Sequence, residues 1–279
     1  MSATTAPHAA TPHLTLPGLW RSEWIKFWTL RSTYWTLAAT AVVFLGVIAL
    51  VSLAIRSLNP ADAGNLDTSL VPFSAAVQIA TIPLLVLGAL IITGEYSTGQ
   101  IRSTFTAVPT RLRVLWTKGA LLAVVTAVVS AVLVAVGAGI SLAVTTGSKV
   151  HLDLHSHETL RILGGSVLYL VTITLFAFAL GGLLRHPAVA LATVLGLLLL
   201  VENIVAGVGL VWHPLQRISP FLPGSAGSRI TASQGQIDML NQQNVYGIHL
   251  TAWEGYGLLV AWVVVILAFA AVRLRSTDA

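Results

Sequence analysis

Long apolar stretches alternate with short polar ones along this chain. A helix needs about 20 apolar residues to cross the hydrocarbon core of a bilayer, and six segments reach or nearly reach that length. They cover residues 34–55, 71–93, 117–145, 162–184, 188–211 and 253–272. The pattern predicts an all-α integral membrane protein with six transmembrane helices, in which residues 19–279 form a single transmembrane domain.

Tryptophans at helical spacing precede the first crossing. Trp20, Trp24 and Trp28 recur every four residues, whereas Lys26 projects from another side of a 3.6-residue helix. We expect an amphipathic helix over residues 19–33 that lies in the membrane interface, with its indole rings at headgroup depth and its bases toward anionic lipid. The alternative is an ordinary aromatic anchor for the helix that follows.

The basic residues orient the predicted helices, because Lys and Arg resist translocation. If the N-terminus is inside, ten of the 15 bases lie on the inner side. The five on the outer side are Arg56, Lys149, Arg161, Arg217 and Arg229. Residues 1–18 have neither the basic start nor the apolar core of a secretory signal peptide. We therefore expect a disordered cytoplasmic tail at 1–18 and both termini in the cytoplasm.

The composition supports the membrane assignment and excludes several kinds of site. Charged residues make up 9% of the chain and hydrophobic residues 56%, whereas soluble domains carry about 25% charged residues. With no Cys, the chain offers no disulfide, thiolate metal site or thiol nucleophile. The net charge of +5 comes from scattered bases that form no nucleic-acid footprint, so we expect membrane lipid as a partner and no nucleic acid.

The sequence contains no motif of the common hydrolases. The Walker A pattern, the H-E-x-x-H zinc pattern and the G-x-S-x-G elbow are all missing, so we expect no catalytic residues and no nucleotide hydrolysis by this chain alone. The segment HLDLHSH at 151–157 could place its His and Asp side chains on one side of an extended chain. Its spacing matches no established ligand pattern, so we expect a solvated loop and no metal site.

Glu202 is the one carboxylate deep within a predicted crossing. A charge at that depth costs from a few to about ten kcal/mol, so the side chain should face other helices or water, or be protonated. Two interpretations remain open: a role in a substrate path or in helix coupling, or an interhelical hydrogen-bonding plug nearer the outer surface. Gln78 in the second crossing is a possible polar partner.

The longest outer loop, residues 212–252, connects the fifth and sixth crossings. Three prolines break any long helix there, and ISPFLPG is apolar enough to re-enter the membrane edge. We expect an outer re-entrant loop with a polar cap, because structureless loops longer than about 15 residues are uncommon. A plain solvated connector is the alternative.

The segment between the second and third crossings, TGEYSTGQIRSTFTAVPTRLRVLWTK at 93–118, breaks the apolar pattern. Ser97 or Thr98 could cap a short helix that Pro109 ends. The following bases would hold the next crossing at the inner face. This predicts a short polar helix against the cytoplasmic side of the membrane.

With SEWIKFWTLRSTYW at 22–35, GEYSTGQIRSTFTAVPTRLRVLWTK at 94–118 and the order of the six segments, the chain resembles the ABC-2-type permease family. These permeases are the membrane subunits of ATP-driven exporters, and the resemblance covers nearly the whole chain. It implies a location in the bacterial plasma membrane. It also implies a six-helix half-transporter that pairs with a second permease, as a homo- or heterodimer, and with two copies of an ABC ATPase subunit. ATP and Mg²⁺ would bind to that ATPase, and this chain would hold no cofactor.

The resemblance also assigns roles to segments. The loop between helices two and three would form a cytoplasmic coupling helix that docks on the ATPase, and the positions carried over to it are Glu95, Gly99, Arg102, Pro109 and Arg111. The segment before the first crossing would correspond to the family's connecting helix, and the loop after the fifth to its outer re-entrant cap. Charged members of the coupling helix could pair with charges on the soluble partner. A basic inner loop that only obeys topology is the alternative.

The predicted function is the permease subunit of an ATP-binding cassette exporter. A stand-alone secondary transporter or channel is the alternative, but such proteins usually show paired repeats and several intramembrane charges, and this chain shows no convincing repeat. A hydrophobic or amphipathic drug, lipid or peptide fits the apolar crossings, and so do other cargoes.

Overall fold

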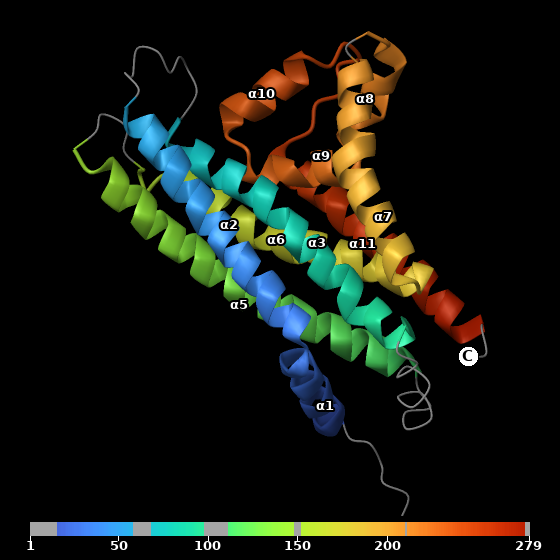
Figure 1. The fold of residues 1–279 in the computed structure, drawn as a ribbon. Coiled ribbons are helices and arrows are strands. Elements are labelled where there is room, and N and C mark those ends of the chain that lie inside the picture. The colour runs from blue at the N-terminus through green and yellow to red at the C-terminus, as the bar shows by residue number, and fades with distance from the viewer. Residues whose placement is uncertain (1–15, 58–67, 98–110, 148–151, 210, 277–279) are drawn as a thin grey trace, which may run out of the picture.

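A computed structural model describes residues 16–57, 68–97, 111–147, 152–209 and 211–276 of the chain. All the regular structure in these ranges is helical, which confirms the predicted all-α fold (Figure 1). Within them, six helical segments are long and apolar enough to cross a membrane. These are α2 (Arg31–Arg56), α3 (Val71–Ser97), α5 (Arg111–Thr145), α6 (His157–Leu184), the segment Pro187–Gly209 and α11 (Ala252–Ser276). The chain is a multi-pass membrane protein.

Helices α3 and α6 form the centre of the bundle, and α2, α5, Pro187–Gly209 and α11 surround them (Figure 1). The backbones of α3 and α6 approach closely at Gly88, where an added Cβ would lie 2.3 Å from the carbonyl oxygen of Thr174. The surrounding helices expose apolar side chains such as Val42 of α2 and Phe269 of α11. Such an outward surface suits contact with lipid tails, while small residues allow close packing inside.

The fifth crossing is not the uniform helix that the apolar run 188–211 predicts. It consists of α7 (Pro187–Leu195), a π-helical segment (Gly196–Val201) and α8 (Glu202–Gly209). π-helical turns are rare and occur often at functional sites. Because the π segment GLLLLV is as apolar as its neighbours, hydrophobicity gives no sign of it.

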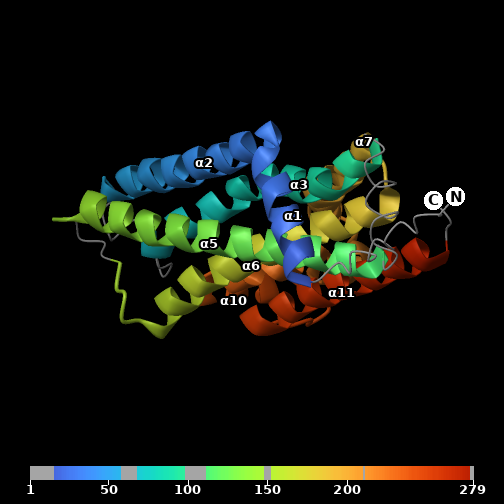
Figure 2. The same ribbon diagram turned by 90° about the horizontal axis from the view of Figure 1, so that it is seen from below.

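Helix α1 (Leu16–Thr29) precedes the bundle and is separated from α2 by Leu30, whose backbone is extended at φ −78° and ψ 117°. The predicted helix 19–33 is therefore wrong at its end, because residues 31–33 belong to α2. Figure 2 shows α1 lying across the beginnings of α2 and α5. We call this end of the bundle the α1 end.

The two faces of α1 differ as an amphipathic helix requires. Trp20 and Trp24 are exposed, whereas Leu19, Glu23 and Phe27 are buried against the bundle. Trp20 and Trp24 thus point away from the protein, as a helix at a membrane interface requires, whereas Trp28 of the predicted stripe is half-buried and packs against the bundle. The buried acid on the opposite face was not anticipated.

The opposite end of the bundle is capped by the folded segment between α8 and α11. It contains the short helices η4 (His213–Arg217), η5 (Ser219–Phe221), α9 (Pro223–Gly227), η6 (Ser228–Thr231) and α10 (Gln234–Gln242). Arg161 of α6 holds it by donating hydrogen bonds to the carbonyl oxygens of Ile230 and Ala232, at 3.1 and 2.9 Å. The alternative of a plain solvated connector is therefore wrong. We call this end of the bundle the α10 end.

Candidate functional site

Four charged side chains meet at the α1 end, and we call Glu23, Lys26, Glu95 and Lys118 the ionic cluster. The Nζ atom of Lys118 lies 2.5 Å from Oε2 of Glu23 and 2.9 Å from Oε1 of Glu95. The Nζ atom of Lys26 lies 2.9 Å from Oε1 of Glu23 and 3.4 Å from Oε1 of Glu95. Each acid thus contacts both bases.

The ionic cluster joins three elements that are distant in the sequence. Glu23 and Lys26 come from α1, Glu95 from the last turns of α3, and Lys118 from the first turns of α5. Glu23, Lys118 and Glu95 are 1%, 5% and 8% exposed. Two acids and two bases balance in charge, and such mutual pairing is what offsets the cost of removing charges from water.

The surroundings shift the pKa values of the two α1 members in opposite directions. Burial by itself would raise the pKa of Glu23, but the attraction and hydrogen bond of Lys118, with those of Lys26, outweigh it and hold that pKa below its ordinary value. Partial burial would lower the pKa of Lys26, but its hydrogen bond to Glu23 and the attraction of Glu95 raise it. Both shifts favour the charged forms.

The structure changes the role expected of Glu95. The resemblance places Glu95 among residues that face a soluble partner, but the carboxylate of Glu95 is buried and pairs with Lys118 and Lys26 of the same chain. Arg111 is the first residue of α5, and its side chain is outside the described residues. Gly99, Arg102 and Pro109 also lie outside them.

Further contacts tie helix ends together at the α1 end. Arg185, in the left-handed conformation at φ 60°, ends α6 and donates a hydrogen bond from Nη2 to the carbonyl oxygen of Arg273 at 2.9 Å. In return, Nη1 of Arg273 donates to the carbonyl oxygen of Leu183 at 2.6 Å. The guanidinium of Arg185 also lies 5.7 Å from the ring centroid of Tyr96. The ends of α3, α6 and α11 are thereby joined.

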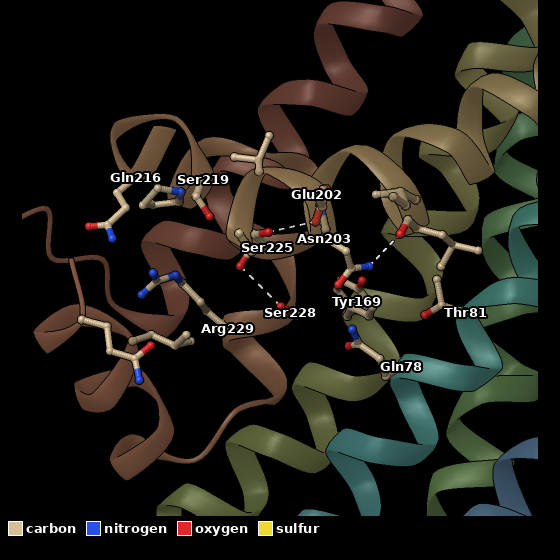
Figure 3. Close-up of a pocket in the computed structure, with 18 of the residues that line it drawn as sticks. Gln78, Thr81, Tyr169, Glu202, Asn203, Gln216, Ser219, Ser225, Ser228 and Arg229 are labelled. Carbon is tan, nitrogen blue, oxygen red and sulfur yellow. Dashed lines mark hydrogen bonds between the residues drawn. The ribbon is translucent and has the colours of Figure 1, made fainter. Parts of the chain in front are cut away.

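The α10 end contains a cavity of about 330 Å³. Its lining comes from α3, α6, the π segment, α8 and the cap between α8 and α11 (Figure 3). Glu202 and Gln78, the two intramembrane polar residues singled out from the sequence, both line it. The cavity also includes Tyr169 and Arg229, for which no sequence pattern predicts a role.

Glu202 uses both carboxylate oxygens to bind the start of α9. Oε1 accepts a hydrogen bond from the backbone N–H of Gly224 at 2.6 Å, and Oε2 accepts one from Oγ of Ser225 at 2.9 Å. A Cβ at position 224 would lie 2.6 Å from Oε2, so glycine permits this approach. No hydrogen bond links Glu202 to Gln78 among the described residues. The geometry favours the hydrogen-bonding interpretation of Glu202, although the residue also borders the cavity.

Arg229 of η6 is 4% exposed and lines the same cavity. Its Nη1 donates to Oδ1 of Asn241 at 2.9 Å and to the carbonyl oxygen of Leu250 at 3.0 Å. Its Nε is buried and has no hydrogen-bond partner among the described residues. Burial lowers the pKa of Arg229. The position was visible in the sequence as one of five bases on the expected outer side, but its burial was not.

The histidine-rich segment folds differently from the extended arrangement considered above. Ser156 caps α6 by accepting a hydrogen bond from the N–H of Glu158, and His157 is the first residue of that helix. Asp153 lies 3.6 Å from Nδ1 of His155, and both are exposed. In the described part of the chain no three His, Cys, Asp or Glu side chains gather around one point; His151 lies outside that part.

A scan against protein-family models finds no match to this chain, and a search of curated proteins finds none either. The resemblance to ABC-2-type permeases therefore rests on the sequence features quoted above and stays a prediction.

Proposed function

We propose that this chain is the permease subunit of an ABC-2-type exporter in a bacterial plasma membrane. In this proposal both termini are cytoplasmic, α1 lies in the inner membrane interface, and the cap with α9 and α10 is the outer re-entrant element. The chain pairs with a second permease and with two copies of a separate ATPase subunit, which bind ATP and Mg²⁺. The multi-pass helical fold and the outward tryptophans of α1 support this proposal.

The ionic cluster is the observation that carries the proposal. The positions carried over to the expected coupling helix run from Glu95 to Arg111, so the proposed helix joins the end of α3 to the start of α5. Glu95 lies at the beginning of this stretch and Lys118 shortly after it, and the two side chains are joined at 2.9 Å. Glu95 and Lys118 are joined to each other, and Lys118 is also joined to Glu23 of α1. A push on the coupling helix would therefore reach three helices together.

Rigid attachment is what a transmission element requires. Small movements at one site are amplified when packed elements shift as bodies rather than deform continuously. The buried charge pairs supply such attachment between α1, α3 and α5, and the contacts of Arg185 extend it to α6 and α11. Energy from ATP binding in the partner would thereby reach the central helices α3 and α6.

Co-purification is the first test. The chain is expressed with a candidate ATPase subunit that carries a Walker A motif, and the complex is isolated through a tag on the permease. A stable complex whose ATP hydrolysis changes with the permease present supports the proposal. Failure of every candidate to bind, together with transport by the chain alone in liposomes, would instead establish the alternative of a stand-alone transporter or channel.

Variants of the ionic cluster sharpen this test. Glu23→Gln should reduce permease-dependent ATP hydrolysis several-fold while the chain still inserts and binds the ATPase. Arg113→Gln is the matched control, because Arg113 is an exposed base in the same part of α5 and outside the ionic cluster. Equal effects of both substitutions would mean that local charge matters and that the cluster does not transmit force.

A further inference from the structure

We propose that the cavity at the α10 end binds an amphipathic anion, with its carboxylate or phosphate group on Arg229 and its apolar part against α8 and the π segment. This proposal concerns the chain alone, so it holds or fails independently of any ATPase partner.

The first argument is an imbalance of charge. Two charged residues line the cavity, Glu202 and Arg229. The carboxylate of Glu202 is compensated by the N–H of Gly224 and the hydroxyl of Ser225 at the start of α9. Arg229 has no carboxylate within ion-pair distance among the described residues. A buried cation without a counter-ion is strongly unfavourable, so an anion has the stronger reason to enter.

The second argument is the geometry of the guanidinium. Its Nη1 is fixed by Asn241 and Leu250, while Nε and Nη2 donate no hydrogen bond to the described residues. The N–H groups of Nε and Nη2 on one edge of a guanidinium point in parallel and match two oxygens of a carboxylate or phosphate. The bonds at Nη1 hold the guanidinium in place before any ligand arrives. Nη2 is the donor that a ligand reaches first, because Nε is closed off from solvent.

The third argument is the character of the walls. Figure 3 shows Arg229 on one side of the cavity and Gln78 and Glu202 on the other. Leu198, Leu199 and Val205 add apolar surface from the fifth crossing. The volume of about 330 Å³ is at the lower end of the range for small-molecule sites. A head group with a short apolar chain therefore fits better than a purely polar ion.

The experiment uses the full chain in phosphatidylcholine nanodiscs and isothermal titration calorimetry, with empty nanodiscs as the blank. The probes are octyl phosphate, octanoate, uncharged octanol and inorganic phosphate. We expect octyl phosphate or octanoate to bind at least about tenfold more tightly than octanol, because a hydrogen bond to a charged group is worth about that factor. Octyl phosphate mimics a lipid head group with a chain, and inorganic phosphate tests a free anion.

Three variants assign the binding to the cavity. Arg229→Gln should abolish the preference for the charged probes, and Arg229→Lys should restore only part of it, because a lysine cannot offer two parallel donors. Ala206→Phe should weaken binding by filling the cavity while Arg229 itself is unchanged. Arg217→Gln is the matched control, since Arg217 is an exposed base over the ring of Tyr246 and outside the cavity. It should change binding by less than about twofold.

The proposal is overturned if wild type binds octanol as tightly as octyl phosphate and octanoate. It is also overturned if Arg217→Gln weakens binding as much as Arg229→Gln, since surface charge would then explain the effect. Inorganic phosphate that binds as tightly as octyl phosphate would refute the amphipathic ligand class. Arg229→Gln also loses two structural hydrogen bonds, so the thermal unfolding of each variant is measured beside its titration. The comparison of probes in the wild type tests the proposal without any variant.

Discussion

Glu23 and Lys118 lie 95 positions apart in the chain and form a buried ion pair, with Oε2 and Nζ 2.5 Å apart. The pair attaches α1, which lies outside the six crossings, to the first turns of α5. A buried pair of this kind adds little stability relative to apolar residues, but removal of one partner leaves the other uncompensated. Single substitutions in the ionic cluster should therefore have large local effects.

Glu23→Gln should loosen α1 from the bundle. Lys118 would keep Glu95 but lose its closest partner, and the two bases would outnumber the remaining acid. The measurement is maleimide labelling of Leu19→Cys, a position 5% exposed, and the chain has no native Cys that would react. The labelling rate should rise at least about tenfold, as expected for a loss of 1.5–3 kcal/mol in a charge-assisted contact.

Two controls accompany this labelling experiment. Arg21→Cys places the thiol on the exposed side of α1, so its labelling should not depend on Glu23. Arg113→Gln in place of Glu23→Gln should leave the rate at Leu19→Cys unchanged. An unchanged rate in Glu23→Gln would show that apolar contacts of Leu19 and Phe27 alone hold α1.

The attachment of α1 should depend on pH in a defined window. The pKa of Glu23 is lowered. The contribution of Glu23 to the attachment of α1 is therefore complete above the ordinary glutamate pKa near 4, and it is lost as the pH falls through the lowered pKa. Because the pKa of Lys26 is raised, the contribution of Lys26 is complete below the ordinary lysine pKa near 10.4 and is lost as the pH rises through the raised pKa. Attachment should thus be constant around neutral pH and weaken in acid.

Electron paramagnetic resonance of a spin label at Arg21→Cys can follow this change. The label should become more mobile as the pH falls below about 4, while mobility stays constant from about pH 6 to 9. Glu23→Gln should be mobile at all pH values and show a smaller acid step. A label whose mobility changes near neutral pH would contradict the assignment to Glu23.

The hydrophobic pattern was sufficient to predict what the membrane imposes. Six crossings follow from the lengths of the apolar runs, and the outward stripe of Trp20 and Trp24 follows from their helical spacing. Both features depend on the average environment of a helix face, which the residue types indicate directly. The π segment at Gly196–Val201 cannot be predicted in this way, because the same apolar residues suit an α-helix or a π-helix.

Individual polar residues were harder to place, because their roles depend on partners distant in the sequence. Glu95 was expected to face a partner protein but pairs with Lys118. Glu23 lies on the same helix face as Leu19 and Phe27, at a spacing of four residues. An acid between two apolar residues at that spacing indicates a buried charge. Arg229 was counted as an outer base, and only the packing of the cap makes it a buried one.

Gly88→Ala should disrupt the contact between α3 and α6. The new Cβ would lie 2.3 Å from the carbonyl oxygen of Thr174, and backbone cannot move aside as a flexible side chain can. Overpacking of this kind costs about 1–3 kcal/mol, which should lower the thermal unfolding midpoint in detergent. Gly139→Ala in α5 is the control, since nothing lies within 4 Å of its Cβ. Equal midpoints for the two variants would refute the close approach.

Glu202→Ala should detach α9 from α8. The substitution leaves the N–H of Gly224 and the hydroxyl of Ser225 without their acceptor, at about 1–3 kcal/mol for each group that stays buried. Glu202→Gln keeps one carbonyl oxygen as acceptor for Gly224 and should lose less than half as much. Gly224→Ala should resemble Glu202→Ala, because its Cβ would lie 2.6 Å from Oε2. All are measured by thermal unfolding in detergent.

Gly207→Ala supplies the control, because it adds a methyl group in α8 with nothing within 4 Å of it. It should leave the unfolding midpoint equal or slightly higher, since Ala favours a helix by up to about 1 kcal/mol over Gly. Comparison of the unfolding midpoint with the transport rate of each variant then separates the two interpretations of Glu202. If Glu202→Gln is stable and transports normally, the residue acts through its hydrogen bonds to α9. If Glu202→Gln is stable but transports poorly, the negative charge itself is required, and Glu202 belongs to the substrate path.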